Sequence, residues 1–221
     1  MTQGSVAIPK EALSQLEAAR YDGEIKVVET EEGILEALST LKEYGKVGFD
    51  TETKPSFKKG YVNKVSLVQL ATPDITYLLR INKTGFTKSL IDFLENPDIL
   101  KIGLSIKDDF HNLAKINNFE PENFIDLQPY VKNFLIADNS LSKIYAILFG
   151  RRICKGQRLT NWEADPLTES QQQYAALDAA ACLEIYNHLE AGKFNPLSSP
   201  YYSISEQSTS ITENNINPTD Q

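Results

Sequence analysis

The chain has 221 residues, of which 41% are hydrophobic and 10% aromatic, and its formal net charge is −8 at pH 7. This length and composition suffice for a full hydrophobic core and favour one globular domain with short extensions. They exclude a protein that coats nucleic acid over its whole surface, because such binding needs Lys and Arg, and a transmembrane helix, because no apolar stretch approaches about 20 residues.

The first half of the chain predicts helices and strands through the spacing of its apolar residues. The predicted elements are, in order, a helix over residues 9–20, a strand over 25–28, a helix over 34–45, and strands over 47–52, 65–71 and 76–81. Pro73 and Asp74 supply the tight turn between the last two strands. A meander of hairpins is the simplest connection of the last three strands.

The second half of the chain alternates helices and strands. Its predicted elements are a helix over residues 87–95, a strand over 100–104, a helix over 108–117, a short strand over 124–127, a helical region up to 150 and a final helix over 168–189. Thr168 and Gln171 form the capping-box signature that opens the final helix. A meander followed by this alternation predicts an α/β domain with a mixed sheet.

The same patterns divide the chain into three parts. Residues 1–23 are predicted to form a helical extension, and residues 24–193 a single domain. Residues 194–221 are rich in Ser, Asn, Thr and Pro. They contain too few apolar side chains to join a core, so we expect this tail to be disordered.

Two carboxylates end the apolar strand predicted over residues 47–52. Residues two apart in a strand face the same side, so Asp50 and Glu52 point together. Two like charges about 4 Å apart cost roughly 4 kcal/mol at an effective dielectric constant near 20, and a divalent cation is the commonest reason for such a pair. The alternative is that the strand simply ends there and water solvates both carboxylates.

The final helix carries another carboxylate on its apolar face. Tyr174 and Asp178 are four residues apart, and the same face continues through Ala181, Cys182 and Ile185. A carboxylate on such a face must be hydrogen-bonded, paired or metal-bound, because an isolated buried charge is too costly. A bond to the backbone or to a nearby Lys is the alternative to a metal.

A third acidic position lies in the helix that follows the strand over 100–104. Asp109 shares a helix face with Leu113 and Ile116, whereas Asp108 lies on the polar side. Asp109 is therefore the inward carboxylate. Asp108 is expected to be exposed near the helix N-terminus, where the helix dipole favours it.

Sequence signals for other kinds of site are weak or absent. His111 and His188 do not have H-E-x-x-H spacing, and the chain has no G-x-S-x-G, G-x-x-x-x-G-K or G-x-G-x-x-G motif. Cys154 and Cys182 lack the spacing of a metal or redox site and fit reduced thiols. Because residues 1–5 also lack the basic start of a secretory signal, we expect a cytoplasmic protein.

Taken in chain order, the acidic positions match three motifs of a known family. Asp50-x-Glu52, Asp109 in the segment KIGLSIKDD, and Tyr174-x-x-x-Asp178 resemble the motifs of the DEDD exonucleases, in the subclass with tyrosine in the last motif. The segment VSLVQLA, and Trp followed by PLTxxQxxYAAxDA, resemble the ribonuclease D and Werner-type exonuclease domains. The resemblance spans residues 25–189.

This resemblance implies a ribonuclease H-like fold, in which helices flank a mixed sheet, and a hydrolase that removes nucleotides from a 3′ end. Asp50 would bridge two divalent cations, Mg²⁺ or Mn²⁺, which suit oxygen ligands. Glu52 and Asp178 would complete the site of the cation that serves the nucleophile, and Asp109 would support the second cation. Tyr174 would position the attacking water.

Contacts with the substrate, the 3′ end of DNA or RNA, are less defined by the sequence. Lys58 and Lys59 follow the first motif, Arg158 lies in a basic stretch before the last, and Thr51 lies between two of the acids, so these four are candidate substrate contacts. Solvated loops are the alternative for the basic residues. Trp162 is expected to pack in the core rather than to stack on a base.

Two other functions remain open. The chain could be a nucleic-acid-binding module that keeps the fold without turnover. It could also be a phosphodiesterase of very short oligonucleotides, which the net charge of −8 makes worth testing. The sequence does not distinguish DNA from RNA, because reading a 2′-hydroxyl depends on contacts that no motif identifies.

Overall fold

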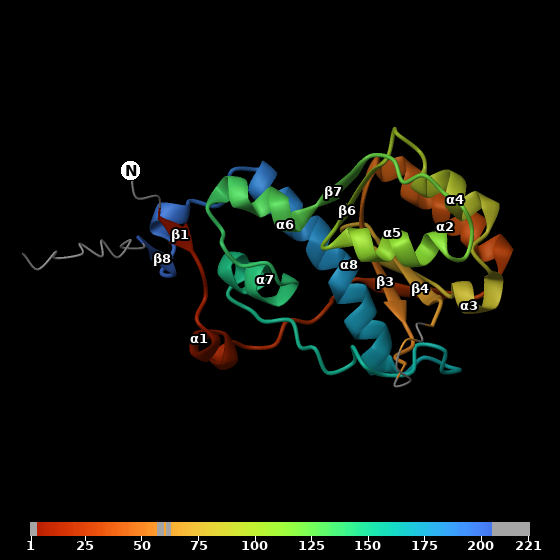
Figure 1. Ribbon diagram of the computed structural model, residues 1–221, viewed down its shortest axis with the longest axis horizontal. Coiled ribbons are helices and arrows are strands. Elements are labelled where there is room, and N and C mark those ends of the chain that lie inside the picture. The colour runs from red at the N-terminus through yellow and green to blue at the C-terminus, as the bar shows by residue number, and fades with distance from the viewer. Residues whose placement is uncertain (1–3, 57–59, 61–62, 205–221) are drawn as a thin grey trace, which may run out of the picture.

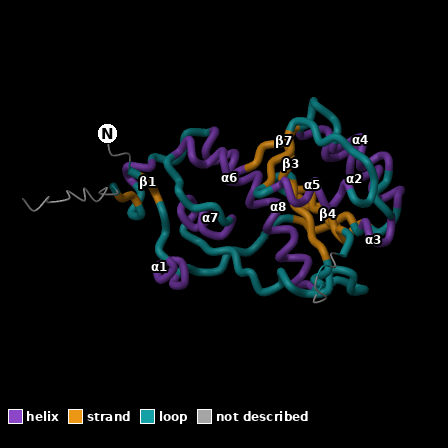
Figure 2. Tube along the Cα trace, in the orientation of Figure 1, coloured by secondary structure: helices purple, strands orange, loops and turns teal. Residues whose placement is uncertain are grey.

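A computed structural model of the chain describes residues 4–56, 60 and 63–204 (Figure 1). The long helix α8 (Glu169–Glu190) crosses the middle of the molecule, with the main sheet on one side and the strands β1 (Ser5–Val6) and β8 (Tyr202–Ser203) on the other (Figures 1 and 2). No helix among the described residues is long and apolar enough to cross a membrane.

The main sheet has six strands in the order β2-β5-β4-β3-β6-β7. Its strands are β2 (Glu24–Val28), β3 (Lys46–Thr53), β4 (Val65–Ala71), β5 (Ile75–Leu79), β6 (Leu100–Gly103) and β7 (Phe124–Asp126). Strands β3, β4 and β5 are antiparallel neighbours, which confirms the predicted meander. Strand β2 joins β5 in parallel, β6 joins β3, and β7 joins β6, which confirms a mixed sheet.

Helices cover both faces of this sheet. One face carries α2 (Glu31–Tyr44), α3 (Ile81–Thr84), α4 (Lys88–Leu94) and α5 (Ile106–Ala114). Val47 and Phe49 of β3 are fully buried in the core beneath these helices. The opposite face carries α8, and beside it lie α6 (Leu127–Tyr130), the 3₁₀ helix η1 (Val131–Phe134) and α7 (Leu141–Phe149).

The alternation of side chains along β3 determines how closely α8 approaches the sheet. Val47 and Phe49 point away from α8, so Gly48 between them faces it. A Cβ atom added at Gly48 would lie only 2.0 Å from the carbonyl oxygen of Ala179. The backbone of α8 therefore packs directly on β3, and only glycine leaves room for this contact.

The N-terminus differs from its prediction. Helix α1 spans only Lys10–Gln15, whereas a helix over residues 9–20 was expected. The backbone beyond it is extended and is held by two hydrogen bonds with Arg152. The Arg152 amide donates to the carbonyl oxygen of Glu17, and the Ala19 amide donates to the carbonyl oxygen of Arg152, each at 2.9 Å. These long-range bonds replace the last helical turn, which local apolar spacing could not reveal.

The polar tail also differs from its prediction in its first part. Residues 194–204 are folded: the 3₁₀ helix η2 (Pro196–Ser198) leads to β8 (Tyr202–Ser203), which pairs with β1 (Ser5–Val6). The expected disorder of residues 194–204 is therefore wrong. Aromatic packing orders this segment, because Tyr201 and Tyr202 pack against the core cluster that contains Val6. The rest of the tail, residues 205–221, lies outside the described residues.

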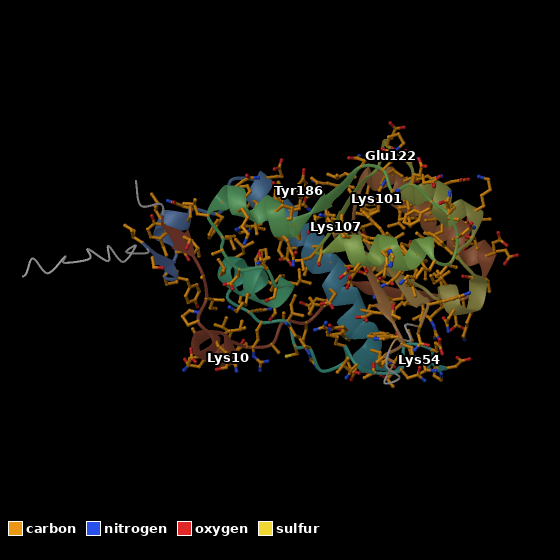
Figure 3. All side chains as sticks on the ribbon, in the orientation of Figure 1. Lys10, Lys54, Lys101, Lys107, Glu122 and Tyr186 are labelled. Atoms are coloured by element: carbon orange, nitrogen blue, oxygen red, sulfur yellow. The ribbon has the colours of Figure 1, made fainter. Side chains whose placement is uncertain are left out.

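The irregular segment 151–168, which precedes α8, is fixed by long-range bonds. The fully buried Arg80 donates from Nη2 to the carbonyl oxygen of Ala164 at 2.7 Å. Lys83 pairs with Asp165 at 2.9 Å. Lys54, which lies just beyond β3 and is labelled in Figure 3, pairs with Glu163 at 2.8 Å. The segment therefore lies beside the end of β3, at the place where the predicted motifs meet.

Candidate active site

Three of the predicted carboxylates meet at the end of β3. Asp50 and Glu52 lie on the β3 face that packs on α8, and Asp178 lies on α8 one residue before its contact with Gly48. One oxygen from each of the three carboxylates lies within 4.8 Å of the others. Carboxylates that lie 126 and 128 residues apart in the sequence thus form one cluster.

Burial raises the pKa of each carboxylate in this cluster, and neighbouring charges add to the shift at Asp50 and Glu52. Glu52 is 9% exposed and Asp178 is 6% exposed. Burial, followed by the charges of Asp178 and Asp109, raises the pKa of Glu52 to about 9. Burial likewise raises the pKa of Asp178 to about 7, and burial together with the neighbouring carboxylates raises the pKa of Asp50 well above its ordinary range.

The fourth carboxylate, Asp109, reaches the site from the opposite face of the sheet. It lies in the first turn of α5, and its Oδ1 accepts a hydrogen bond from the hydroxyl of Thr51. Burial raises the pKa of Asp109 to about 6, although the bond from Thr51 opposes this shift. Asp109 and Glu52 line one cleft of about 370 Å³. Asp108 is exposed, as the helical phase predicted.

Tyr174 lies one turn before Asp178 on α8, and its hydroxyl is hydrogen-bonded to that carboxylate. Burial and the charge of Asp178 raise the pKa of Tyr174, so the hydroxyl keeps its proton at neutral pH. Trp162 is fully buried and its ring centroid lies 6.1 Å from that of Tyr174. Trp162 is therefore a packing residue that supports Tyr174, as expected from the sequence.

Basic side chains from the segment 151–168 face the acidic cluster. Lys155 and Arg158 line a cavity of about 330 Å³ together with Asp50, Tyr174 and Asp178. Arg158 also lines the cleft of Glu52 and Asp109, so it lies between the two spaces. Its charge lowers the pKa of Glu52, and the charge of Lys155 lowers that of Asp178.

The structure places only part of the predicted substrate contacts. Arg158 lies in the site, whereas Lys58 and Lys59 lie outside the described residues. Gln128 and Asn139, which the sequence did not single out, line the cavity beside Asp50. They come from α6 and the loop before α7, and no local pattern links polar residues at such positions to a distant carboxylate.

The four carboxylates fit divalent cations. Three form one cluster, the fourth lines a cleft together with Glu52, and their oxygen atoms are the ligands that Mg²⁺ and Mn²⁺ prefer. Burial first, and then the charges of the neighbouring carboxylates, raise the pKa values of Asp50 and Glu52, so the negative charges are costly here without a counter-charge. Cations at this position would remove that repulsion.

Comparison with known proteins agrees with this geometry. The family model described as "3'-5' exonuclease" matches residues 25–192. The chain belongs to the 3′-5′ exonuclease family. This match includes all five motif residues, which are Asp50, Glu52, Asp109, Tyr174 and Asp178.

Curated relatives share this part of their sequence with the chain. The bifunctional 3′-5′ exonuclease/ATP-dependent helicase WRN of Mus musculus is 34% identical over 149 residues, which cover 65% of this chain and 11% of that protein. A 3′-5′ exonuclease of Arabidopsis thaliana is 32% identical over 151 residues, covering 65% of this chain and 52% of that protein. The chain thus spans at most about half of these relatives.

Solved structures confirm the ribonuclease H-like fold. The EXO domain of Aedes aegypti Nibbler superposes with a TM-score of 0.69 at 25% identity, covering 81% of this chain and 96% of that domain. Escherichia coli RNase D superposes with a TM-score of 0.68 at 22% identity, covering 76% of this chain and 44% of that protein. The mixed sheet flanked by helices is therefore shared across these exonucleases.

The raised pKa of Glu52 predicts that this carboxyl group destabilises the metal-free protein at alkaline pH. From about pH 4.5 to pH 9 the unfolded state has lost a proton that the folded state keeps, so the free energy of unfolding falls as pH rises. At pH 8 in the presence of a chelator, Glu52→Gln should stabilise the protein by at least about 1 kcal/mol, which corresponds to a rise in Tm of at least about 2–4 °C.

The Glu52→Gln gain should shrink towards pH 4.5, where wild-type Glu52 is protonated in the folded state and half-protonated when unfolded. Thermal unfolding followed by circular dichroism measures it. Glu36→Gln on the exposed side of α2 is the control and should leave Tm unchanged. An equal or lower Tm for Glu52→Gln at pH 8 would contradict the assigned electrostatics.

Proposed function

We propose that the chain is a metal-dependent exonuclease that hydrolyses phosphodiester bonds at the 3′ ends of DNA or RNA and releases nucleoside monophosphates. The observation that supports this most strongly is the cluster of Asp50, Glu52 and Asp178 within 4.8 Å, beside Lys155 and Arg158. An acidic centre suits cations, and a basic rim suits phosphates. The proposed compartment is the cytoplasm.

Two divalent cations, Mg²⁺ or Mn²⁺, fit the acidic centre. Asp50, Glu52 and Asp178 would hold the first cation, and Asp50 and Asp109 would hold the second. When bound, such a pair lowers the pKa of a water molecule and stabilises the attacking and the leaving oxygen of an in-line displacement. The chain supplies no histidine to this centre, because His111 and His188 line neither the cavity nor the cleft.

The remaining side chains of the site have separate tasks in this proposal. Tyr174 keeps its proton and orients the attacking water through its hydroxyl, while its bond to Asp178 fixes the ring. Lys155 and Arg158 hold the phosphates on either side of the bond that breaks. Water adds to phosphorus as the bond to the 3′ oxygen breaks, so a nucleoside 5′-monophosphate leaves and the shortened strand ends in a 3′-hydroxyl.

Local charge explains how an acidic protein could hold nucleic acid. The chain has a net charge of −8, but Lys155 and Arg158 both lie at the rim of the site. Contacts with only a few phosphates give weak, salt-sensitive binding, which suits an enzyme that must release its strand. It also suits a phosphodiesterase of very short oligonucleotides, which is the second candidate function.

Digestion of labelled oligonucleotides tests the proposal. With Mg²⁺ or Mn²⁺, a 5′-labelled strand should shorten in single-nucleotide steps, whereas a 3′-labelled strand should release labelled mononucleotide at once. Asp50→Asn should abolish both, because it removes the carboxylate that would hold both cations, and Asp108→Asn, an exposed neighbour of the site, should not. Strands of RNA and DNA, and dinucleotides beside longer strands, define the substrate. The proposal fails if every strand stays intact or if Asp50→Asn retains full activity.

Replacing Tyr174 with Phe tests the task of its hydroxyl. We expect kcat to fall about 100-fold, because a misplaced reacting group costs about that much. Oligonucleotide affinity in Ca²⁺ and the affinity for Mn²⁺ should stay at the wild-type level, since the ring still packs on Trp162. Tyr186→Phe on the same helix is the control. Equal losses of binding and of kcat would refute this assignment.

A further inference from the structure

Thr51 lies between two cluster carboxylates but faces the other way. Along β3, Asp50 and Glu52 point towards α8, so Thr51 shares the opposite face with Phe49. On that face Phe49 packs against Phe110 of α5, with ring centroids 6.4 Å apart. This packing brings the residue before Phe110, which is Asp109, opposite Thr51.

The hydroxyl of Thr51 already donates a hydrogen bond within the protein. Its proton is donated to Oδ1 of Asp109. A hydroxyl has one proton to donate, and phosphate oxygens accept but do not donate. Thr51 therefore cannot donate to a substrate phosphate while this bond exists, which argues against the substrate contact expected from the sequence.

We propose that Thr51 is a positioning residue: its hydroxyl holds the carboxylate of Asp109 in the orientation that the second divalent cation requires. This inference rests on the metal site of the proposed function. Asp109 is the only one of the four acids that comes from the α5 face, and it is absent from the group of three whose oxygens lie within 4.8 Å. The orientation of the Asp109 carboxylate therefore depends on a hydrogen bond from outside that group.

The surroundings of Asp109 show why a support is needed. Asp109 is half-buried in the first turn of α5, where its side chain could also turn towards water beside Asp108 and Asn112. Holding it on Thr51 removes rotamer freedom before the cation binds, so less entropy is lost on binding. Hydrogen-bonding partners of ligating carboxylates typically change metal affinity about 10–100-fold.

Binding of Mn²⁺ to the full chain without nucleic acid, measured by calorimetry and electron paramagnetic resonance, tests this role. Thr51→Val keeps the shape of the side chain but removes the donor, and should weaken the second Mn²⁺ site about 10–100-fold while the first is kept. Thr51→Ser keeps the donor and should restore most of the affinity. Thr53→Val on the same strand is the matched control and should bind both ions as the wild type does.

A double-mutant cycle shows whether Thr51 acts through Asp109. In an Asp109→Asn background, Thr51→Val should cause no further loss of Mn²⁺ affinity, because the supported carboxylate is gone. Equal losses with and without Asp109 would overturn the proposal. So would normal binding of two Mn²⁺ ions by Thr51→Val together with weaker oligonucleotide binding, which would make Thr51 a substrate contact.

The folding of the variants and the proposed activity are controlled separately. Thr51→Ser retains the hydroxyl, so a loss of Mn²⁺ affinity equal to that of Thr51→Val would indicate a general structural effect and overturn the proposal. The Mn²⁺ titration needs no turnover. If the wild type binds two ions but shortens no oligonucleotide, the proposed exonuclease function fails while the role of Thr51 is still measured.

Discussion

The backbone of α8 rests on β3 at Gly48, where a Cβ atom would lie 2.0 Å from the carbonyl oxygen of Ala179. Asp178 immediately precedes Ala179, and Asp50 follows Gly48 by two residues on the same face of the strand. A single close contact therefore sets the distance between carboxylates that come from two distant parts of the chain. Any larger residue at position 48 would push the helix, and Asp178 with it, away from the strand.

Such closeness is electrostatically unfavourable for the bare protein. Burial raises the pKa values of Asp50, Glu52 and Asp178, and repulsion from neighbouring carboxylates adds to the shift at Asp50 and Glu52, so stability is lost at alkaline pH unless a counter-charge enters. Lys155 and Arg158 supply a fraction of that charge from the rim. This balance explains how a protein with a net charge of −8 could present the local site for two cations and a polyanion that we propose.

Local patterns in the sequence predicted those features of the site that depend only on neighbouring residues in one strand or helix. Strand alternation placed Asp50 and Glu52 on one side, and helical phase turned Asp109 and Asp178 inward. The partner of Thr51 and the contact at Gly48 depend on how separate elements pack, and no spacing rule encodes that. The predicted helix over residues 9–20 and the predicted disorder from residue 194 were wrong for the same reason, because long-range pairing fixes the extended backbone after Gln15 and the strand at Tyr202.

The most direct test of this account is cation binding by Gly48→Ala, compared with Gly156→Ala, whose Cβ would meet no atom within 4 Å. Calorimetric titration with Mn²⁺, with folding checked by circular dichroism, gives the measurement. Gly48→Ala should fold with an overpacking cost of about 1–3 kcal/mol and lose affinity for Mn²⁺, because Asp178 moves away from Asp50 and Glu52. Gly156→Ala should bind as the wild type does. Wild-type Mn²⁺ affinity in Gly48→Ala would contradict the claim that this contact builds the site.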